Sequence, residues 1–561
     1  MEAAGFICIA VIVVAIIFGN GILNEKKFKN AYRDKLIQRY GEKADRKYKD
    51  GEFEHICGYE KEHADDFRID EITWSDLDMD AVYKQMNYCK CSAGEEYLYY
   101  RLRHPRIKEY HFDRMEEVTE YFRKNETDRL KLQLALHEMG YTGKYSMYDY
   151  LNNLDTLGER NNKKDILVDL LFIPAAGMLF WQIGYGIALI FVLILYNLIT
   201  YFKEKSIIEP YITCFAYVFR VLNEVDAIKA VPCSCIDEEK EKLLFYKKKF
   251  GKFKRFSSLI MSKSRMTGNP TEIIIDYARM FFHLDIIKFN SMLNEVKKHT
   301  EDIDMLLTIM GKLDFYLAIG EYRTYLHEYS IPVFSKQEYQ IQGLYHPLLE
   351  TPVKNDIMIK KSILFTGSNA SGKSTMLKAI AVNALLAQSV HTVAADSYHA
   401  DYFRIYTSLS LKDNIFEGDS YYMAEIRAMK RIIDASEDTR TPLICFVDEV
   451  LRGTNTVERI AASTMILKTL SAIHGYCFAA THDIELTDIL KHYYENYHFE
   501  EEMNQEDIHF SYCLHPGKAT TRNAIKLLDV MGYGSQITRN ANLLAEQFEQ
   551  NGIWQVLERQ A

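Results

Sequence analysis

Two long stretches without charged residues are the clearest feature in the pattern of apolar and polar positions along the chain. Residues 3–24 carry no charge, and neither do the 33 residues from 170 to 202. A helix rises about 1.5 Å per residue and a bilayer core is about 30 Å thick, so the first stretch predicts a membrane anchor over residues 1–24. One helix over the second stretch would be roughly 50 Å long. That length favours a transmembrane hairpin over 166–202, turning near Trp181–Gly184.

Basic residues beside these stretches predict how the chain is oriented. Lysines follow the first stretch and flank the second on both sides: Lys26, Lys27, Lys29, Lys163, Lys164, Lys203 and Lys205. Because such flanks stay on the cytoplasmic side, we expect a multi-pass protein of the cell membrane with its folded parts in the cytoplasm. A cleaved signal peptide would want basic residues before the apolar run, where Glu2 stands. A single span over 183–202 is the alternative to the hairpin.

Most of the remaining N-terminal two-thirds repeats its apolar positions with helical spacing. Residues 106–160 and 207–330 show this pattern. Its members include Leu306, Leu307, Met310, Leu313 and Leu317. The pattern predicts an all-α domain in two parts, residues 25–165 and 203–335, with the hairpin inserted between them.

Composition narrows the class of protein. A chain of 561 residues is too long for one hydrophobic core. Its net charge of −10 argues against a protein that coats nucleic acid by bulk charge. The ten cysteines form no disulfide framework. Two C-x-C pairs, Cys89/Cys91 and Cys233/Cys235, are spaced too closely for a usual structural zinc site, which favours reduced cysteines in a cytosolic fold.

The C-terminal third carries a phosphate-binding loop in its expected setting. Ser362 to Thr366 is a short apolar run that predicts a strand, and a helical run follows the loop. The loop fits G-x-x-x-x-G-K-[ST] and consists of Gly367, Ser368, Asn369, Ala370, Ser371, Gly372, Lys373, Ser374 and Thr375. Its backbone N–H groups suit the phosphates of ATP, Lys373 suits the β and γ oxygens, and Ser374 suits Mg²⁺.

Two further apolar runs end in side chains that suit the same chemistry. The run Leu443 to Val447 predicts a buried parallel strand that delivers Asp448 and Glu449. Asp448 can hold Mg²⁺ and Glu449 can polarise the attacking water. A third strand, Tyr476 to Ala480, brings His482 toward the γ-phosphate. We therefore expect Lys373, Glu449 and His482 to be catalytic and Ser374 and Asp448 to bind the metal.

Four motifs in this region resemble those of the MutS family, in the family's order. Asp448–Thr456 resembles D-E-x-x-R-G-T-[ST]-T, and Ala480–Thr487 is similar to A-T-H-x-x-E-L-T. Gly418–Glu425 resembles G-x-S-x-F-M-x-E, and His346-Pro347 matches the family's H-P. The resemblance implies that residues 336–561 form an α/β P-loop NTPase of ABC/MutS type, with a mostly parallel sheet and C-terminal dimerisation helices. It also implies a homodimer in which Ser420 touches the γ-phosphate of the partner's ATP.

The resemblance is weaker before the hairpin, where residues 72–80 and 92–105 look like the opening of the MutS core domain. It implies core and lever helices, whereas no α/β pattern surrounds Phe53-Glu54 to suggest a mismatch-recognition domain. A basic stretch over 247–265 could follow DNA phosphates, lie on anionic lipid, or be a solvated helix face. We expect a membrane-tethered ATPase dimer that binds mismatched or branched DNA; the alternative is a clamp acting on a protein or lipid.

Overall fold

The computed structural model divides the chain into two units. Unit 1 comprises the described residues up to Ala64 together with Met86–Tyr100 and His111–Tyr325, and unit 2 comprises the rest. The described residues are 26–143, 147–158, 160–251, 270–326, 328–367, 371–409, 421–451, 454–503, 508–519, 525, 528 and 531–557. The anchor expected over residues 1–24 lies outside them.

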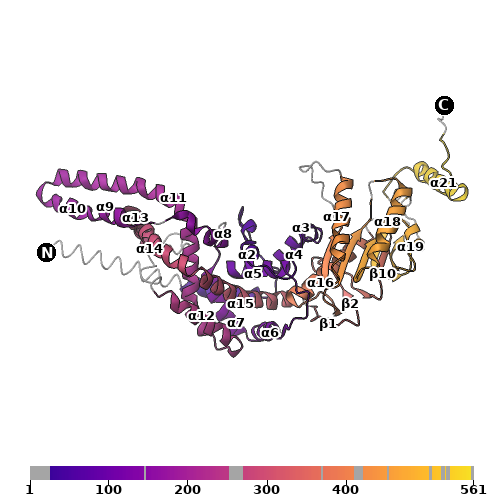
Figure 1. Cartoon of the computed structure of the whole chain (residues 1–561), viewed down its shortest axis with the longest axis horizontal. Coiled ribbons are helices and arrows are strands. Elements are labelled where there is room, and N and C mark those ends of the chain that lie inside the picture. The colour runs from indigo at the N-terminus through magenta and orange to yellow at the C-terminus, as the bar shows by residue number, and fades with distance from the viewer. Residues whose placement is uncertain are drawn as a thin grey trace. The chain divides into compact units, whose positions relative to one another are not determined.

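Unit 1 is helical (Figure 1). After a helix over residues 26–38, its elements are η1 (Phe53–His55), α2 (Gly58–Glu62), α5 (Ser92–Arg103), α6 (Asp113–Lys124), α7 (Glu126–Met139), α8 (Met147–Asn152), η2 (Leu154–Leu157), α9 (Lys163–Leu170), α10 (Phe172–Trp181), α11 (Ile183–Lys229), η3 (Ser234–Ile236), α12 (Asp237–Lys249), α13 (Pro270–Phe282), α14 (Leu284–Lys298) and α15 (Thr300–Leu326). The five apolar residues that define the helical spacing of 306–317 are all buried along α15.

A helical hairpin occupies the second apolar stretch. The chain reverses at Gln182, whose extended backbone separates α10 from α11, and the two helices run side by side (Figure 1). Gly186 permits this close approach, because a Cβ there would lie 2.8 Å from the backbone nitrogen of Leu179. Many outward side chains are apolar, with Phe180 and Trp181 at the tip almost fully exposed.

One described helical segment is long and apolar enough to cross a bilayer, Ile183–Glu209 with 27 residues. Only 17% of its most apolar part is buried, unlike the core helix of a soluble protein, although length and composition alone are weak evidence for a span. α10 is about 15 Å long, too short to cross by itself. The prediction of two spans within 166–202 is therefore not confirmed.

Unit 2 contains two sheets and several helices (Figure 1). The smaller sheet has the order β1 (Val333–Phe334), β5 (Ser397–Ala400), β2 (Gln340–Leu344), β3 (Asn355–Met358). The larger has the order β10 (Ile508–Pro516), β9 (Glu495–Met503), β4 (Ile363–Thr366), β8 (Gly475–Ala480), β7 (Leu443–Asp448), β6 (Arg404–Ser408). Its strands are parallel except for β10. The helices are α3 (Glu71–Asp76), α4 (Met79–Met86), α16 (Lys373–Val390), α17 (Tyr421–Ser436), α18 (Thr456–Leu470), α19 (Glu485–Ile489) and α21 (Ser535–Asn551).

Two segments that the sequence places in the helical domain belong to unit 2. Residues 65–85 and 101–110 cluster with the C-terminal part of the chain in unit 2. The buried carboxylate of Asp76 accepts hydrogen bonds from the Thr407 hydroxyl (2.7 Å) and the Leu409 N–H (2.8 Å), at the end of β6. This carboxylate thus satisfies polar groups at the sheet edge, which helical spacing alone could not indicate.

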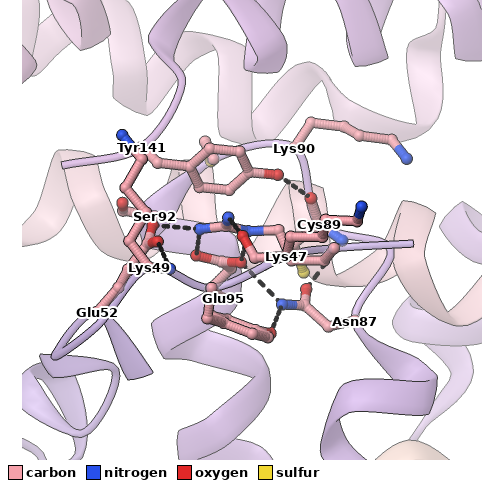
Figure 2. Close-up of polar contacts among 12 residues, drawn as sticks. Lys47, Lys49, Glu52, Asn87, Cys89, Lys90, Ser92, Glu95 and Tyr141 are labelled. Atoms are coloured by element: carbon pink, nitrogen blue, oxygen red, sulfur yellow. Dashed lines mark hydrogen bonds and ion pairs between the residues drawn. The ribbon is translucent and has the colours of Figure 1, made fainter. Parts of the chain in front are cut away.

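A buried ion-pair cluster holds an N-terminal segment of unit 1 against α5 (Figure 2). The guanidinium of Arg46 donates to Glu95 (2.7 Å) and Glu52 (2.5 Å) and lies 3.9 Å from the ring centre of Tyr141. The Asn87 amide also donates to Glu95 (2.8 Å). Burial raises the pKa of Glu95 to about 7, although Arg46 and Asn87 oppose the shift.

Removing this cation should destabilise unit 1. We expect Arg46→Ala to cost about 3–5 kcal/mol, because it leaves buried carboxylates without their partner. The matched control is Arg39→Ala, which removes an exposed ion pair with Glu42 and Asp45 and should change stability little. Thermal unfolding of the detergent-solubilised chain measures both, and equal melting temperatures would contradict the assignment.

The loss of folding stability caused by Arg46→Ala, called the deficit below, should also depend on pH. Without Arg46 the pKa of Glu95 rises further above its unfolded value, so the folded chain must either keep a proton that the unfolded chain releases or bury a charge. The deficit should therefore grow as the pH increases from about 5 to about 8. A constant deficit over that range would argue against Glu95 as the group left unpaired.

Candidate nucleotide-binding site

The phosphate-binding loop joins β4 to α16 in unit 2. Its two described glycines have backbone angles that other residues rarely adopt, with φ of +145° at Gly367 and +106° at Gly372. A Cβ on Gly372 would also lie 3.2 Å from the ring of Tyr512. Gly372 is the N-cap of α16, so the loop ends where free backbone N–H groups favour an anion.

The side chains that follow the loop turn back toward the ends of the strands. Lys373 is buried, and its Nζ donates to the carbonyl of Gly367 (2.8 Å) and lies 3.5 Å from His482 Nε2. The hydroxyl of Ser374 donates to the carboxylate of Asp448 at the end of β7. A lysine, a hydroxyl and a carboxylate therefore meet beside the N-terminus of α16.

Glu449 and His482 form a second contact at the same edge of the sheet. His482 Nε2 lies 2.8 Å from Glu449 Oε1, an ion pair when the imidazole is protonated. The backbone N–H of Glu449 donates to the Ala480 carbonyl (2.9 Å), which ties the end of β7 to the end of β8. Glu449 has a φ of +57°, a strained conformation for a residue with a side chain. Such strain concentrates at functional sites.

An arginine that the sequence analysis did not single out supports this edge. Arg459, near the start of α18, holds both carboxylate oxygens of Asp483 at 3.0 and 2.6 Å. Hydrogen bonding and charge from Asp483, with smaller contributions from Glu449 and Glu485, raise the pKa of Arg459. The pair anchors the residue next to His482. From the sequence, Arg459 is indistinguishable from a charge on a solvated helix face.

A pocket of about 290 Å³ opens beside the loop. Its lining includes Tyr345, His346, Gly372, Met376, Phe499 and Tyr512. Burial, helped by the charge of Lys378, lowers the pKa of His346 to about 4, so this imidazole is neutral at physiological pH. The H-P motif therefore contributes to a largely uncharged cavity that reaches the first turn of α16.

Most of the site residues expected from the sequence are found together here. Gly367, Ser371, Gly372, Lys373, Ser374, Thr375, Asp448, Glu449 and His482 all lie in the loop or at the adjoining edge of the sheet. Ser368, Asn369, Ala370 and Ser420 lie outside the described residues. The additional residues that the structure brings to the site are Arg459, Asp483 and Tyr512.

Comparison with known proteins agrees with this geometry. The family model described as MutS domain V matches residues 363–549. The DNA mismatch repair protein MutS of Thermotoga sp. (strain RQ2) is 33% identical over 213 residues, which are 36% of this chain and 26% of that protein. A protein of the same name from Thermus thermophilus is 28% identical over 279 residues, 48% of this chain and 34% of its own.

Residues 363–549 therefore match domain V of the MutS family, and the resemblance to that family expected from the sequence is confirmed. The matched part corresponds to about a quarter to a third of the length of these relatives. The match therefore does not assign the activity of the whole relatives to this chain.

Proposed function

We propose that the chain is a membrane-tethered MutS-type ATPase that binds and hydrolyses ATP as a homodimer. The observation that carries the proposal is the convergence of Lys373, Ser374 and Asp448 with the Glu449–His482 pair at the N-terminus of α16. A lysine and free helix N–H groups suit phosphates, and hydroxyl and carboxylate oxygens suit Mg²⁺.

The proposed roles follow from these positions. Ser374 and Asp448 would hold Mg²⁺, which supplies positive charge to the phosphates when bound. Lys373 would bind the β and γ oxygens, and Glu449 would orient the attacking water with His482 beside it. The adjoining pocket, with Tyr512 next to Gly372, is suited to the nucleoside.

Self-association is supported by the C-terminal helix. α21 exposes Ile537 and Leu543, and Trp554 stacks on Phe548 just beyond it while remaining largely exposed. Apolar side chains so disposed favour burial against a second copy. The dimer would also bring Ser420 of one chain to the ATP of the other, as the family motif implies.

Membrane attachment is supported by the exposed apolar surface of α10 and α11 and by the 27-residue segment Ile183–Glu209. A soluble protein rarely leaves so large an apolar surface in water. We propose that this hairpin and the N-terminal apolar stretch hold the chain on the cytoplasmic side of the cell membrane.

DNA is the proposed partner, since the relatives are named as DNA mismatch repair proteins. The described lysines of the basic stretch give this part little support. Lys247 pairs with Asp226 (2.5 Å) and Lys249 with Asp302 (2.6 Å), so both are neutralised within unit 1. Any phosphate contact would come from the exposed Lys248, from residues 252–265, which lie outside the described residues, or from the helical core.

The first test separates binding of ATP from its hydrolysis. Lys373→Ala should weaken nucleotide binding, whereas Glu449→Gln should bind normally and hydrolyse about 100-fold or more slowly, because only Glu449 orients water. Glu437→Gln, an exposed acidic residue beyond α17, is the matched control. Equal loss of binding in the Lys373 and Glu449 variants would refute the role of Glu449.

Because two chains share the proposed sites, the rate of ATP hydrolysis per chain should rise with protein concentration.

The second test concerns topology. Single cysteines replacing Glu2 and Gln182 on a cysteine-free background should react with an impermeant reagent in intact cells. Cysteines replacing Arg255, Gln505 and the exposed Lys61 should react only after lysis, since all positive flanks are expected in the cytoplasm. Labelling at position 61 in intact cells would indicate a single span and overturn the proposed arrangement.

The third test concerns the partner. Detergent-solubilised protein should bind mismatched duplex more tightly than matched duplex, and the affinity should fall with salt as phosphate contacts are lost. Changing Lys252 and Lys254 to Gln should flatten the salt dependence, whereas Lys247→Gln should not, because Lys247 is already paired with Asp226. Absence of binding at low salt would point to a protein or lipid partner instead.

A further inference from the structure

The two C-x-C pairs of the chain differ in how the structure arranges their sulfurs. The Sγ atoms of Cys233 and Cys235 are 2.6 Å apart. A disulfide bond is about 2.05 Å long, so only a small movement separates the two thiols from bonding distance. In the other pair, Cys91 Sγ donates to the carboxylate of Asp314 (3.1 Å).

The Cys233/Cys235 pair lies in the turn between α11 and α12. Cys233 is extended (φ −114°, ψ 117°) and is followed by the short η3, which returns the second sulfur to the first. The carbonyl of Cys233 accepts a hydrogen bond from Lys240 Nζ (2.5 Å), and its N–H donates to Val231 (2.8 Å). These bonds on both sides of Cys233 fix the backbone that holds the thiols together.

Asp314 holds the other pair in a different way. Its carboxylate accepts the N–H groups of Lys90 (2.8 Å) and Cys91 (3.0 Å) in addition to the Cys91 thiol. The Cys91 sulfur therefore points at a carboxylate. The two pairs have the same spacing in the sequence but different contacts. The sulfurs of Cys233 and Cys235 lie against each other, whereas the sulfur of Cys91 donates to Asp314.

We propose that Cys233 and Cys235 are a reversible thiol–disulfide modification site, oxidised by low-molecular-weight disulfides such as glutathione disulfide. Cys235 is the more exposed residue of the pair, at 8% against 1% for Cys233. Its sulfur attacks the oxidant, forms a mixed disulfide and releases one glutathione thiol. The sulfur of Cys233 then attacks Cys235 Sγ and releases the second. Two protein thiols lose two hydrogens and two electrons, and the oxidant becomes two thiols.

The surroundings determine the character of this site. Burial raises the pKa of Cys235, so little thiolate is present and the first step is slow. The second step is fast because the partner sulfur is already in place. The disulfide would close a small ring across the single residue Ser234, and reduction by glutathione reverses its formation by the same exchange.

The test exploits a difference in tryptic cleavage. The full chain in detergent is equilibrated with glutathione mixtures of increasing oxidised fraction, quenched with acid, and alkylated with N-ethylmaleimide under denaturing conditions. Trypsin releases residues 230–240 with both cysteines on one peptide, whereas it cuts after Lys90, between Cys89 and Cys91. We expect peptide 230–240 to pass from two maleimide adducts to none with a loss of two hydrogens, while Cys89 and Cys91 remain alkylated throughout.

Two results would overturn the proposal. One is a peptide 230–240 that keeps two maleimide adducts, or carries glutathione on single sulfurs, at every mixture. The other is oxidation of Cys89 and Cys91 at the same mixtures, which would show that the contact of the sulfurs confers no selectivity. Cys235→Ser controls for the chemistry, because the remaining thiol can form only a mixed disulfide. The measurement does not involve ATP hydrolysis, so its result does not depend on whether the proposed function is correct.

Discussion

The register of three neighbouring parallel strands is the constraint on which the candidate site depends. β4, β8 and β7 pair so that Phe365 lies opposite Ala480, and Ala480 opposite Asp448. The ladder continues into the loops, where Thr481 N–H donates to Phe365 (3.0 Å) and Glu449 N–H donates to Ala480 (2.9 Å). A slip of one residue in β7 would turn Asp448 to the opposite face. The contacts of Asp448 with Ser374 and of Glu449 with His482 are therefore consequences of backbone pairing.

This dependence explains why so much of the candidate site could be predicted from the sequence. Each of the three strands is a short apolar run whose end is marked by a polar residue, and parallel strands bring such ends to one edge. Arg459 and Asp483 could not be found in this way. Their pairing joins the start of α18 to the residue after His482, and nothing in the local pattern of either segment indicates the other. The strained φ of Glu449 is likewise invisible in the sequence.

The sequence predicts that this part of the fold is helical, but it does not predict which side chains of distant segments contact one another. Spacing identifies α15 because its apolar residues recur every three to four positions from Ile303 to Leu317. It does not indicate that every residue from Leu313 to Arg323 is buried. The assignment of residues 65–85 to unit 2 depends on Asp76 satisfying polar groups at the end of β6, more than 300 residues away. The Arg46–Glu95 pair is similar: both residues would be read as surface charges, yet Glu95 is buried and the cluster orders the N-terminal segment. Buried charge of this kind is specified by tertiary contact.

The long helix α11 connects two different environments within unit 1. Its first part exposes apolar residues such as Phe191 and Ile199, and its last part buries Tyr217 and Leu222 in the helical core. Pro210 lies between them, directly after the candidate span, and it lacks the N–H that would continue the helical ladder. Proline weakens a helix at that position, yet α11 runs unbroken from Ile183 to Lys229. The chain leaves this helix at the turn that contains Cys233 and Cys235. A disulfide in that turn would stiffen the connection between the buried half of α11 and α12.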